Sequence, residues 1–213
     1  MTAMNSFSLV LCEGKEDRLV FEKVASLAGL TGLVFEDYGG KNNLGNHLRA
    51  LKDRKDFAQN QIRKIALTRD ADDSHADAWK SLSASAKAAF GIDLAQPGEI
   101  VTMQRTHPRD PPISITGWIL PGEGRSGMLE SICLDSVAAN PGYACLSEYV
   151  KCLETVSAAK LHPKAQFHAW VVSHTDFKDK DYNIATAVEE NRFEWGDPAF
   201  DGLRAFLRSL AAH

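Results

Sequence analysis

Apolar stretches and helical periodicities alternate over the first 90 residues of the chain. Three short apolar stretches, each bounded by glycine or polar residues, are typical of buried strands. The stretches are residues 6–12, 33–35 and 62–68. Each is followed by a segment with apolar residues at helical spacing, and these segments are residues 16–28, 41–51 and 74–90. The alternation favours an α/β fold in which helices flank a parallel sheet with right-handed crossovers.

The pattern changes after Gly91. Two further strands are expected at residues 99–104 and 113–120, on either side of a proline-rich turn, as a hairpin or as one more strand beside the sheet. From residue 127 onward the pattern is helical. Helices are expected at residues 128–139, 144–159, 163–172, 184–191 and 198–210. We therefore expect one domain over residues 1–213, with an α/β core at 6–120 and a helical extension at 127–213 packed on it.

Acidic residues follow two of the predicted strands. Glu13 comes directly after the first strand, and Asp70 and Asp72 come after the third. In an open α/β sheet, ligands bind at the carboxyl ends of the strands, and residues i and i+2 of an extended segment point the same way. If the two strands are neighbours, their carboxylates converge, and a cation such as Mg²⁺ would relieve the repulsion. The alternative is that these acids only cap helices and stay solvated.

These residues resemble the motifs of the Toprim domain, which is shared by topoisomerases, bacterial primases, maturation ribonucleases and the overcoming-lysogenization-defect (OLD) nucleases. The matching segments are Leu11-Cys12-Glu13-Gly14 and Asp70-Ala71-Asp72, with Gly39-Gly40-Lys41 after the second strand. The spacing is similar to that of stand-alone Toprim-like bacterial proteins of uncharacterised function. The resemblance implies a Toprim/Rossmann-like sheet and a site for Mg²⁺, with Mn²⁺ as a substitute, in which Glu13 is a metal ligand or a proton shuttle.

The second half of the chain resembles the OLD-type branch. That resemblance points to Glu130 as a further metal ligand beside Asp17, and to Lys164 as a catalytic cation that neutralises charge on a reacting oxygen. An ordinary first-turn acid and a solvated surface lysine are the alternatives. Lys41, at a glycine-rich helix start, and Arg69, beside the acidic pair, are candidate phosphate contacts. A simple tight turn at Gly39-Gly40 remains the alternative for Lys41.

Composition limits how the protein could bind a polyanion. The 213-residue chain has a formal net charge of −4 and a sequence pI near 6.0. Proteins that coat nucleic acid through charge alone usually carry a strong basic excess, so a local basic patch or a metal ion would be needed. The four cysteines form no CxxC pair and no zinc spacing with histidine. No apolar run reaches the ~20 residues of a membrane span, and no signal peptide is evident, so we expect a soluble cytoplasmic protein.

The function that these features favour is Mg²⁺-dependent hydrolysis of phosphodiesters in nucleic acid, alone or with a separately encoded protein partner. The chain has no Walker A sequence, so the ATPase that accompanies OLD nucleases is not expected in it. Two alternatives stay open. One is a non-catalytic Toprim-like module that binds metal and nucleotide as a regulatory subunit, and the other is a small RNA-maturation ribonuclease.

Overall fold

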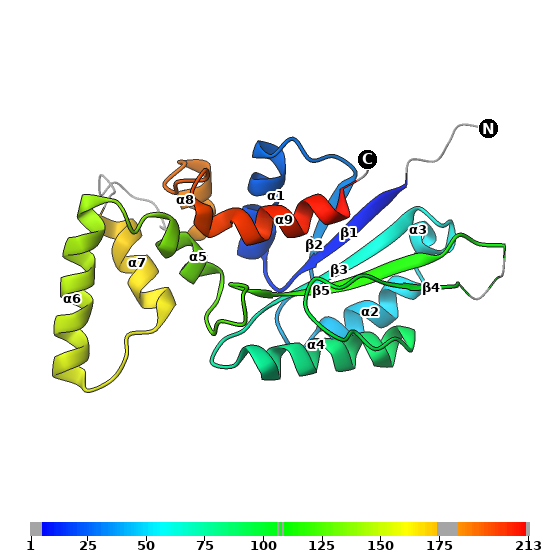
Figure 1. Cartoon of the computed structure of the whole chain (residues 1–213), viewed down its shortest axis with the longest axis horizontal. Helices are drawn as coiled ribbons and strands as arrows, with labels where there is room; N and C mark the ends of the chain where they lie inside the picture. Colours follow the sequence, from blue (N-terminus) through cyan, green and yellow to red (C-terminus); the bar gives the residue numbers. More distant parts are fainter. Residues whose placement is uncertain (1–5, 106, 108, 174–182, 212–213) are drawn as a thin grey trace.

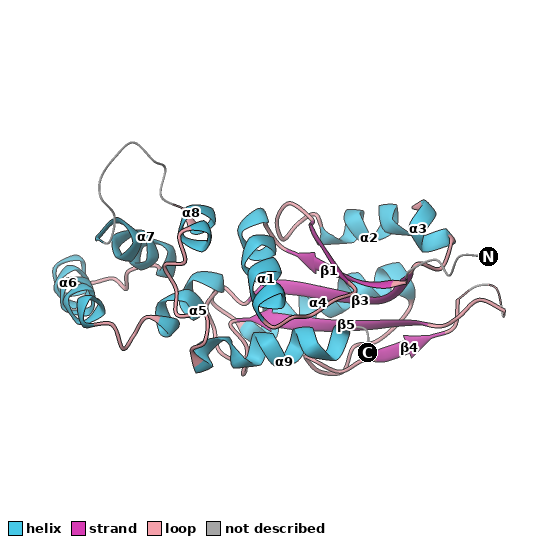
Figure 2. Ribbon diagram, turned by 90° about the horizontal axis from the view of Figure 1, so that it is seen from above, coloured by secondary structure: helices cyan, strands magenta, loops and turns pink. Residues whose placement is uncertain are grey.

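One five-stranded sheet runs through the protein. The computed structural model describes residues 6–105, 107, 109–173 and 183–211. The strand order is β2-β1-β3-β5-β4; the first four of these strands are parallel, and β4 runs antiparallel to β5. Figures 1 and 2 show the sheet between helices. The strands are β1 (Phe7–Cys12), β2 (Leu33–Asp37), β3 (Ile62–Asp70), β4 (Val101–Met103) and β5 (Ile113–Leu120).

Alternation along the strands divides the apolar residues between the two faces of the sheet. In β1, Leu9 and Leu11 belong to one buried cluster, whereas Val10 and Cys12 belong to the other. All four side chains are fully buried, as expected for an internal strand covered on both faces. The continuous apolar run is therefore the signature of a strand between two helical layers.

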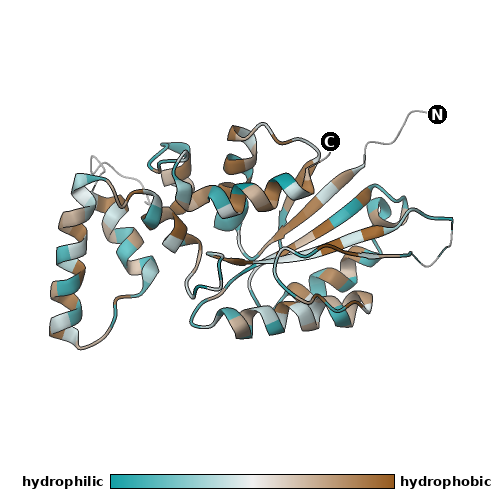
Figure 3. Cartoon of the chain, viewed as in Figure 1, coloured by the Kyte–Doolittle hydropathy of each residue, from teal (hydrophilic) through white to brown (hydrophobic). Residues whose placement is uncertain are grey.

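Helices from the first half of the chain cover the face that Leu9 and Leu11 line. The longest of them begins after Ser74, whose side chain accepts a hydrogen bond from the Asp77 N–H, and ends at Gly91 in the left-handed conformation. Apolar and polar residues alternate along it in Figure 3, because only one side of the helix contacts the sheet. The helices of this layer are α2 (Leu44–Lys52), α3 (Lys55–Ala58) and α4 (His75–Phe90).

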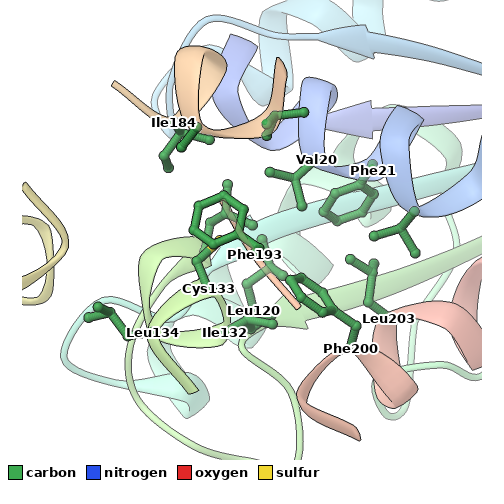
Figure 4. Close-up of a cluster of buried hydrophobic side chains, with 14 of the residues drawn as sticks. Val20, Phe21, Leu120, Ile132, Cys133, Leu134, Ile184, Phe193, Phe200 and Leu203 are labelled. Atoms are coloured by element: carbon green, nitrogen blue, oxygen red, sulfur yellow. The ribbon is translucent and has the colours of Figure 1, made fainter. Parts of the chain in front are cut away.

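One early helix covers the opposite face together with part of the second half of the chain, and the rest of that half extends the same hydrophobic cluster beyond the sheet. Phe21 of the early helix and Phe200 are fully buried in the cluster that joins these segments, shown in Figure 4. The elements are α1 (Lys15–Leu27), α5 (Leu129–Ser136), α6 (Pro141–Ser157), α7 (Pro163–Ser173), α8 (Ile184–Glu189), the 3-10 helix η1 (Pro198–Phe200) and α9 (Asp201–Leu210).

Helix α9 lies beside α1 over the sheet, whereas α6 and α7 lie beyond the carboxyl ends of the strands (Figure 1). Two hydrogen bonds fasten α9 to the sheet. The Ser8 hydroxyl donates to the Leu210 carbonyl at 2.6 Å, and the Lys64 ammonium donates to the Ser209 carbonyl at 2.8 Å. Residues more than 140 positions apart in the sequence are thereby joined.

The predicted fold class is confirmed: a mostly parallel sheet is flanked by helices and followed by a helical part. Several boundaries differ from the prediction. The helix expected at 41–51 begins only at Leu44, and the one expected at 144–159 begins at Pro141, because Asn140 caps it and proline suits the first helical turn. The short helix α3 was not predicted. Two arrangements were expected for the segments after Gly91, and the structure shows the hairpin, in which β4 and β5 pair antiparallel.

Across the residues that the structure describes, no helix is long and apolar enough to cross a membrane.

Candidate functional site

The loop after β1 places two carboxyl groups at the carboxyl end of the sheet. Strand β1 pairs with β3, so the residues that follow both strands lie next to each other. Glu13 follows β1, and Asp17 stands one turn into α1. The Gly14 N–H donates to Asp17 Oδ2 at 2.7 Å, which turns the aspartate back over the loop. A Cβ at position 14 would lie 3.3 Å from that oxygen, so glycine permits the close approach.

Asp70, the last residue of β3, connects the sheet to the helical part. Its Oδ1 accepts a hydrogen bond of 3.1 Å from the Leu129 N–H in the first turn of α5. A carboxylate is favoured there because the first amides of a helix lack partners within the helix. The contact fixes the start of α5 beside β3. Glu130, which follows Leu129, is thereby brought close to Asp70.

A cavity of about 170 Å³ lies among these groups. Five of the residues predicted from the sequence line it together, although they come from five different elements or loops. They are Glu13, Asp17, Asp70, Glu130 and Lys164. We call this space the carboxyl cavity. The remaining lining residues are Gly14, Lys15, Glu16, Gly40, Leu129 and Ile184.

Burial and mutual repulsion disfavour the charged forms of the inner carboxyl groups. Burial raises the pKa of Asp17 to about 7, with further contributions from the charges of Glu13 and Glu130, against the opposing hydrogen bond from Gly14. Burial, followed by the charge of Asp17, raises the pKa of Asp70 well above its usual range, against the hydrogen bond from Leu129. The two carboxyl groups therefore hold protons at higher pH than exposed aspartates do.

Glu130 and Lys164 face each other across the cavity. Glu130 is only 4% exposed, and its Oε1 lies 3.8 Å from Lys164 Nζ. Burial raises the pKa of Glu130, and the positive charge of Lys164 offsets part of that effect. The side chain of Lys164 is 54% exposed. Lys164 thus stands at the mouth of a cavity in whose lining acidic residues outnumber lysines.

Asp72 lies outside the carboxyl cavity. The extended geometry that would have aimed Asp70 and Asp72 at one point does not continue to Asp72, because β3 ends at Asp70 and Asp72 adopts the left-handed conformation with φ 51°. Its Oδ2 pairs with Lys41 Nζ at 3.0 Å. The charge of Asp72 still contributes to the raised pKa of Glu13, for which burial is the largest cause.

Arg69, a candidate phosphate contact, is hydrogen-bonded to α4, and its predicted role stays a prediction. Its Nη1 donates to the Ser81 hydroxyl in α4 at 2.7 Å, while Lys41 pairs with Asp72 instead. The positive charge of Arg69 nevertheless acts against the upward shift of the Glu13 pKa. Within the described chain, Lys41 is thus paired with an acid outside the carboxyl cavity, and Arg69 is bonded to a serine of α4.

Two residues of the site were not singled out from the sequence. Glu16 lines the carboxyl cavity, and its first-turn position in α1 was a signal that could have found it. Tyr38 lies buried behind Glu13 and donates its hydroxyl proton to the Thr68 carbonyl at 2.8 Å. Burial, followed by the charges of Glu13 and Asp17, raises the pKa of Tyr38, which keeps it protonated. No local pattern indicated this contact between the ends of β2 and β3.

The donor set suits a hard cation. All the acidic groups offer oxygen, the ligand that Mg²⁺ prefers, and Glu13 Oε2 is buried without a hydrogen-bond partner in the described part of the chain. As they stand, however, the described residues contain no group of three or more His, Cys, Asp or Glu side chains that could hold a metal ion. Any cation would have to be bound by fewer protein ligands, or the side chains would have to move towards it.

Comparisons with known proteins identify a family and a fold. The model of a family described as "Protein of unknown function (DUF3226)" matches residues 8–212. No curated protein matches the sequence. A solved structure, the crystal structure of hypothetical protein PH0156 from Pyrococcus horikoshii OT3, is similar with a TM-score of 0.57. The sequences are 16% identical, and the similarity covers 96% of this chain and 95% of that one, so it bears on the fold alone.

Proposed function

The chain belongs to the DUF3226 family of proteins of unknown function, and we propose that it is a Mg²⁺-dependent phosphodiester hydrolase that acts on nucleic acid. The observation that carries this proposal is the carboxyl cavity, where the four acids predicted from the sequence surround one space and Lys164 stands at its mouth. Raised pKa values in such a cluster are typical of functional sites, because folding alone gains nothing from crowding like charges.

Asp17, Asp70 and Glu130 would hold the cation. Mg²⁺ usually keeps several of its waters and takes only one or two protein carboxylates, so a closed set of three ligands is not required. When bound, it would supply Lewis-acid activation of the phosphodiester and lower the pKa of a water molecule. The Toprim resemblance of Glu13-Gly14 and Asp70-Ala71-Asp72 supports the same type of site and stays a prediction.

The protein's own residues divide the remaining tasks. In the hydrolysis, a water oxygen forms a bond to phosphorus, the bond to the ester oxygen breaks, and the water proton must leave. Glu13 is partly exposed and has a raised pKa, which suits it to accept that proton. Lys164, at the mouth of the carboxyl cavity, would neutralise negative charge on the phosphate or on the leaving oxygen.

A cleavage assay tests the proposal. Purified protein is incubated with Mg²⁺ or Mn²⁺ and with single-stranded and duplex forms of DNA and RNA. Asp70→Asn keeps an oxygen for the Leu129 N–H but removes the charge, and we expect it to reduce cleavage by about 100-fold or more. Asp93→Asn, at an exposed site, is the control. Equal cleavage by wild type and Asp70→Asn, or no cleavage of any substrate, contradicts the proposal.

One observation favours a second function, a non-catalytic module that binds metal and nucleotide. Asp72 pairs with Lys41 instead of facing Asp70, so the acidic cluster lacks one of the carboxylates expected from the Toprim pattern. Such a module would bind nucleotide or nucleic acid in a metal-dependent manner and would cleave nothing. The same assay separates the two functions when binding is measured alongside cleavage.

A further inference from the structure

A second, larger cavity lies next to the carboxyl cavity. It has a volume of about 640 Å³ and is formed between the loops that follow β2, β3 and β5 and the loop that joins α6 to α7. We call it the side cavity. Its walls continue those of the carboxyl cavity along the chain: Lys41 follows Gly40, Met128 precedes Leu129, and Pro163 precedes Lys164. The two cavities are therefore bordered by consecutive residues at three places in the chain.

The charges of the side cavity do not favour a polyanion backbone. Two lysines, Lys41 and Lys160, face three carboxylates, which are Asp72, Asp73 and Glu154. Lys41 is already paired with Asp72. Binding through backbone phosphates alone needs a surplus of cations to displace the counterions of the nucleic acid. The lining lacks this surplus, so whatever binds there must be held mainly by other contacts.

The side cavity offers apolar walls beside hydrogen-bonding groups. Met128, Leu161 and Pro163 provide the apolar part, and Ser126 and Gln166 provide polar groups. Gln166 Nε2 donates to the Leu161 carbonyl at 2.7 Å, which steadies the loop and leaves the Gln166 amide oxygen as an acceptor. A nucleobase has flat apolar faces and carries hydrogen-bond donors and acceptors along its edges. It would therefore complement a wall of this kind.

The size and position of the side cavity limit the form of the nucleic acid. A volume of about 640 Å³ is in the range of small-molecule sites, enough for one or two nucleotides. Bases in a duplex are stacked and paired inside the helix and would have to be flipped out to enter such a pocket. A single strand presents its bases without that cost.

We propose that the side cavity receives unpaired bases of a single-stranded nucleic acid, while the adjoining phosphodiester enters the carboxyl cavity. This inference rests on the proposed function, because it identifies the substrate class of the same site. It also accounts for a chain with net charge −4 that would act on nucleic acid: recognition falls to base contacts, and a bound cation would hold the phosphate.

Binding assays with four ligands test the inference without relying on catalysis. The ligands are a fluorescent single-stranded 10-nucleotide oligomer, its duplex, the same strand with abasic sites, and mixed mononucleotides as competitors. Fluorescence anisotropy in Mg²⁺ should show that the duplex and the abasic strand bind at least about 10-fold more weakly than the intact strand, because neither offers free bases to the apolar wall and the Gln166 amide oxygen. Equal affinity of the abasic strand or of the duplex overturns the inference. Mononucleotides that compete as well as the strand, at equal nucleotide concentration, also overturn it.

A substitution in the cavity wall provides the second measurement. Ser126 is exposed and makes no hydrogen bond through its side chain within the described residues, so Ser126→Leu narrows the cavity without removing a contact. We expect it to weaken binding of the single strand about 5-fold or more. Ala84→Leu, on the exposed side of α4, is the matched control and should change nothing. Loss of affinity in both variants, or in neither, contradicts the assignment.

The two proposals fail in different ways. Binding with a preference for intact single strands, but without cleavage, leaves this inference standing and refutes the hydrolase. Cleavage that Asp70→Asn abolishes, but that proceeds equally on duplex and single strands, leaves the hydrolase standing and refutes the base-binding role of the side cavity. Cleavage and binding are therefore read from the same samples.

Discussion

Neutralising Asp17 should stabilise the protein in the absence of metal. The pKa of Asp17 rises from 3.8 in an ordinary aspartate to about 7 in the folded protein, so folding opposes its ionisation. For an acid whose pKa is higher in the folded state, the unfolded state binds fewer protons between the two values. The free energy of unfolding therefore falls as the pH rises from about 4 towards 7. Below that window the folded protein bears no such penalty.

The size of the effect follows from the pKa difference. At about 1.4 kcal/mol per pKa unit, the penalty is about 2 kcal/mol at pH 5 and reaches about 4 kcal/mol at pH 8. Asp17→Asn removes it, and the amide oxygen can still accept the hydrogen bond from Gly14. For a chain of this length, 1 kcal/mol corresponds to roughly 2–4 °C in melting temperature, so we expect a gain of about 10 °C at pH 8.

Thermal unfolding in EDTA is the appropriate assay, because chelation excludes any contribution from bound cations. Wild type and Asp17→Asn are compared at pH 5 and pH 8, with Glu99→Gln as a control that removes one exposed carboxylate. The gain must be larger at pH 8 than at pH 5. A variant that melts at the wild-type temperature or below it at pH 8 would refute the idea that the buried carboxylate destabilises the fold.

Three further predictions concern the cation and the core. Mg²⁺ should raise the melting temperature of the wild type more at pH 8 than at pH 6, because protons compete for Asp17 below about pH 7; equal shifts would argue against a site at Asp17. Gly127→Ala should lower the free energy of unfolding, measured in urea, by about 1–3 kcal/mol, because Gly127 has φ 127° and a Cβ there would lie 2.7 Å from Ser131 Oγ. Gly196→Ala, with open space around the new methyl group, is its control and should change stability by less than about 1 kcal/mol. Phe200→Ala should lower the unfolding free energy by about 3–5 kcal/mol, because Phe200 is fully buried; a smaller loss would mean that the cluster collapses to fill the space.

Local patterns predicted β1, β3 and β5 well because each of these internal strands contains a buried apolar run. The predicted site required β1 and β3 to be neighbours in the sheet, and they are neighbours. The approach of Glu13 to Asp70 follows from that order together with the rule that parallel strands end at the same edge. Positions set by strand register are thus accessible from sequence.

Positions that depend on loop conformation or on distant packing were less accessible. Asp72 turned away because its backbone is left-handed, which the alternation rule for extended segments does not anticipate. Glu130 and Lys164 were singled out through a family resemblance, since no periodicity shows which loop the start of α5 will approach. Glu130 lies next to Leu129, which is hydrogen-bonded to Asp70 across 59 residues of sequence.

The attachment of α9 to the sheet has a consequence for the order of events during synthesis. The first strand leaves the ribosome early, but its Ser8 hydroxyl finds the Leu210 carbonyl only after α9 has been made. Until then the α1 face of the sheet lacks Phe200 and Leu203, which belong to its core. The nascent chain therefore exposes apolar surface and has neither Glu130 nor Lys164 in place for much of its translation.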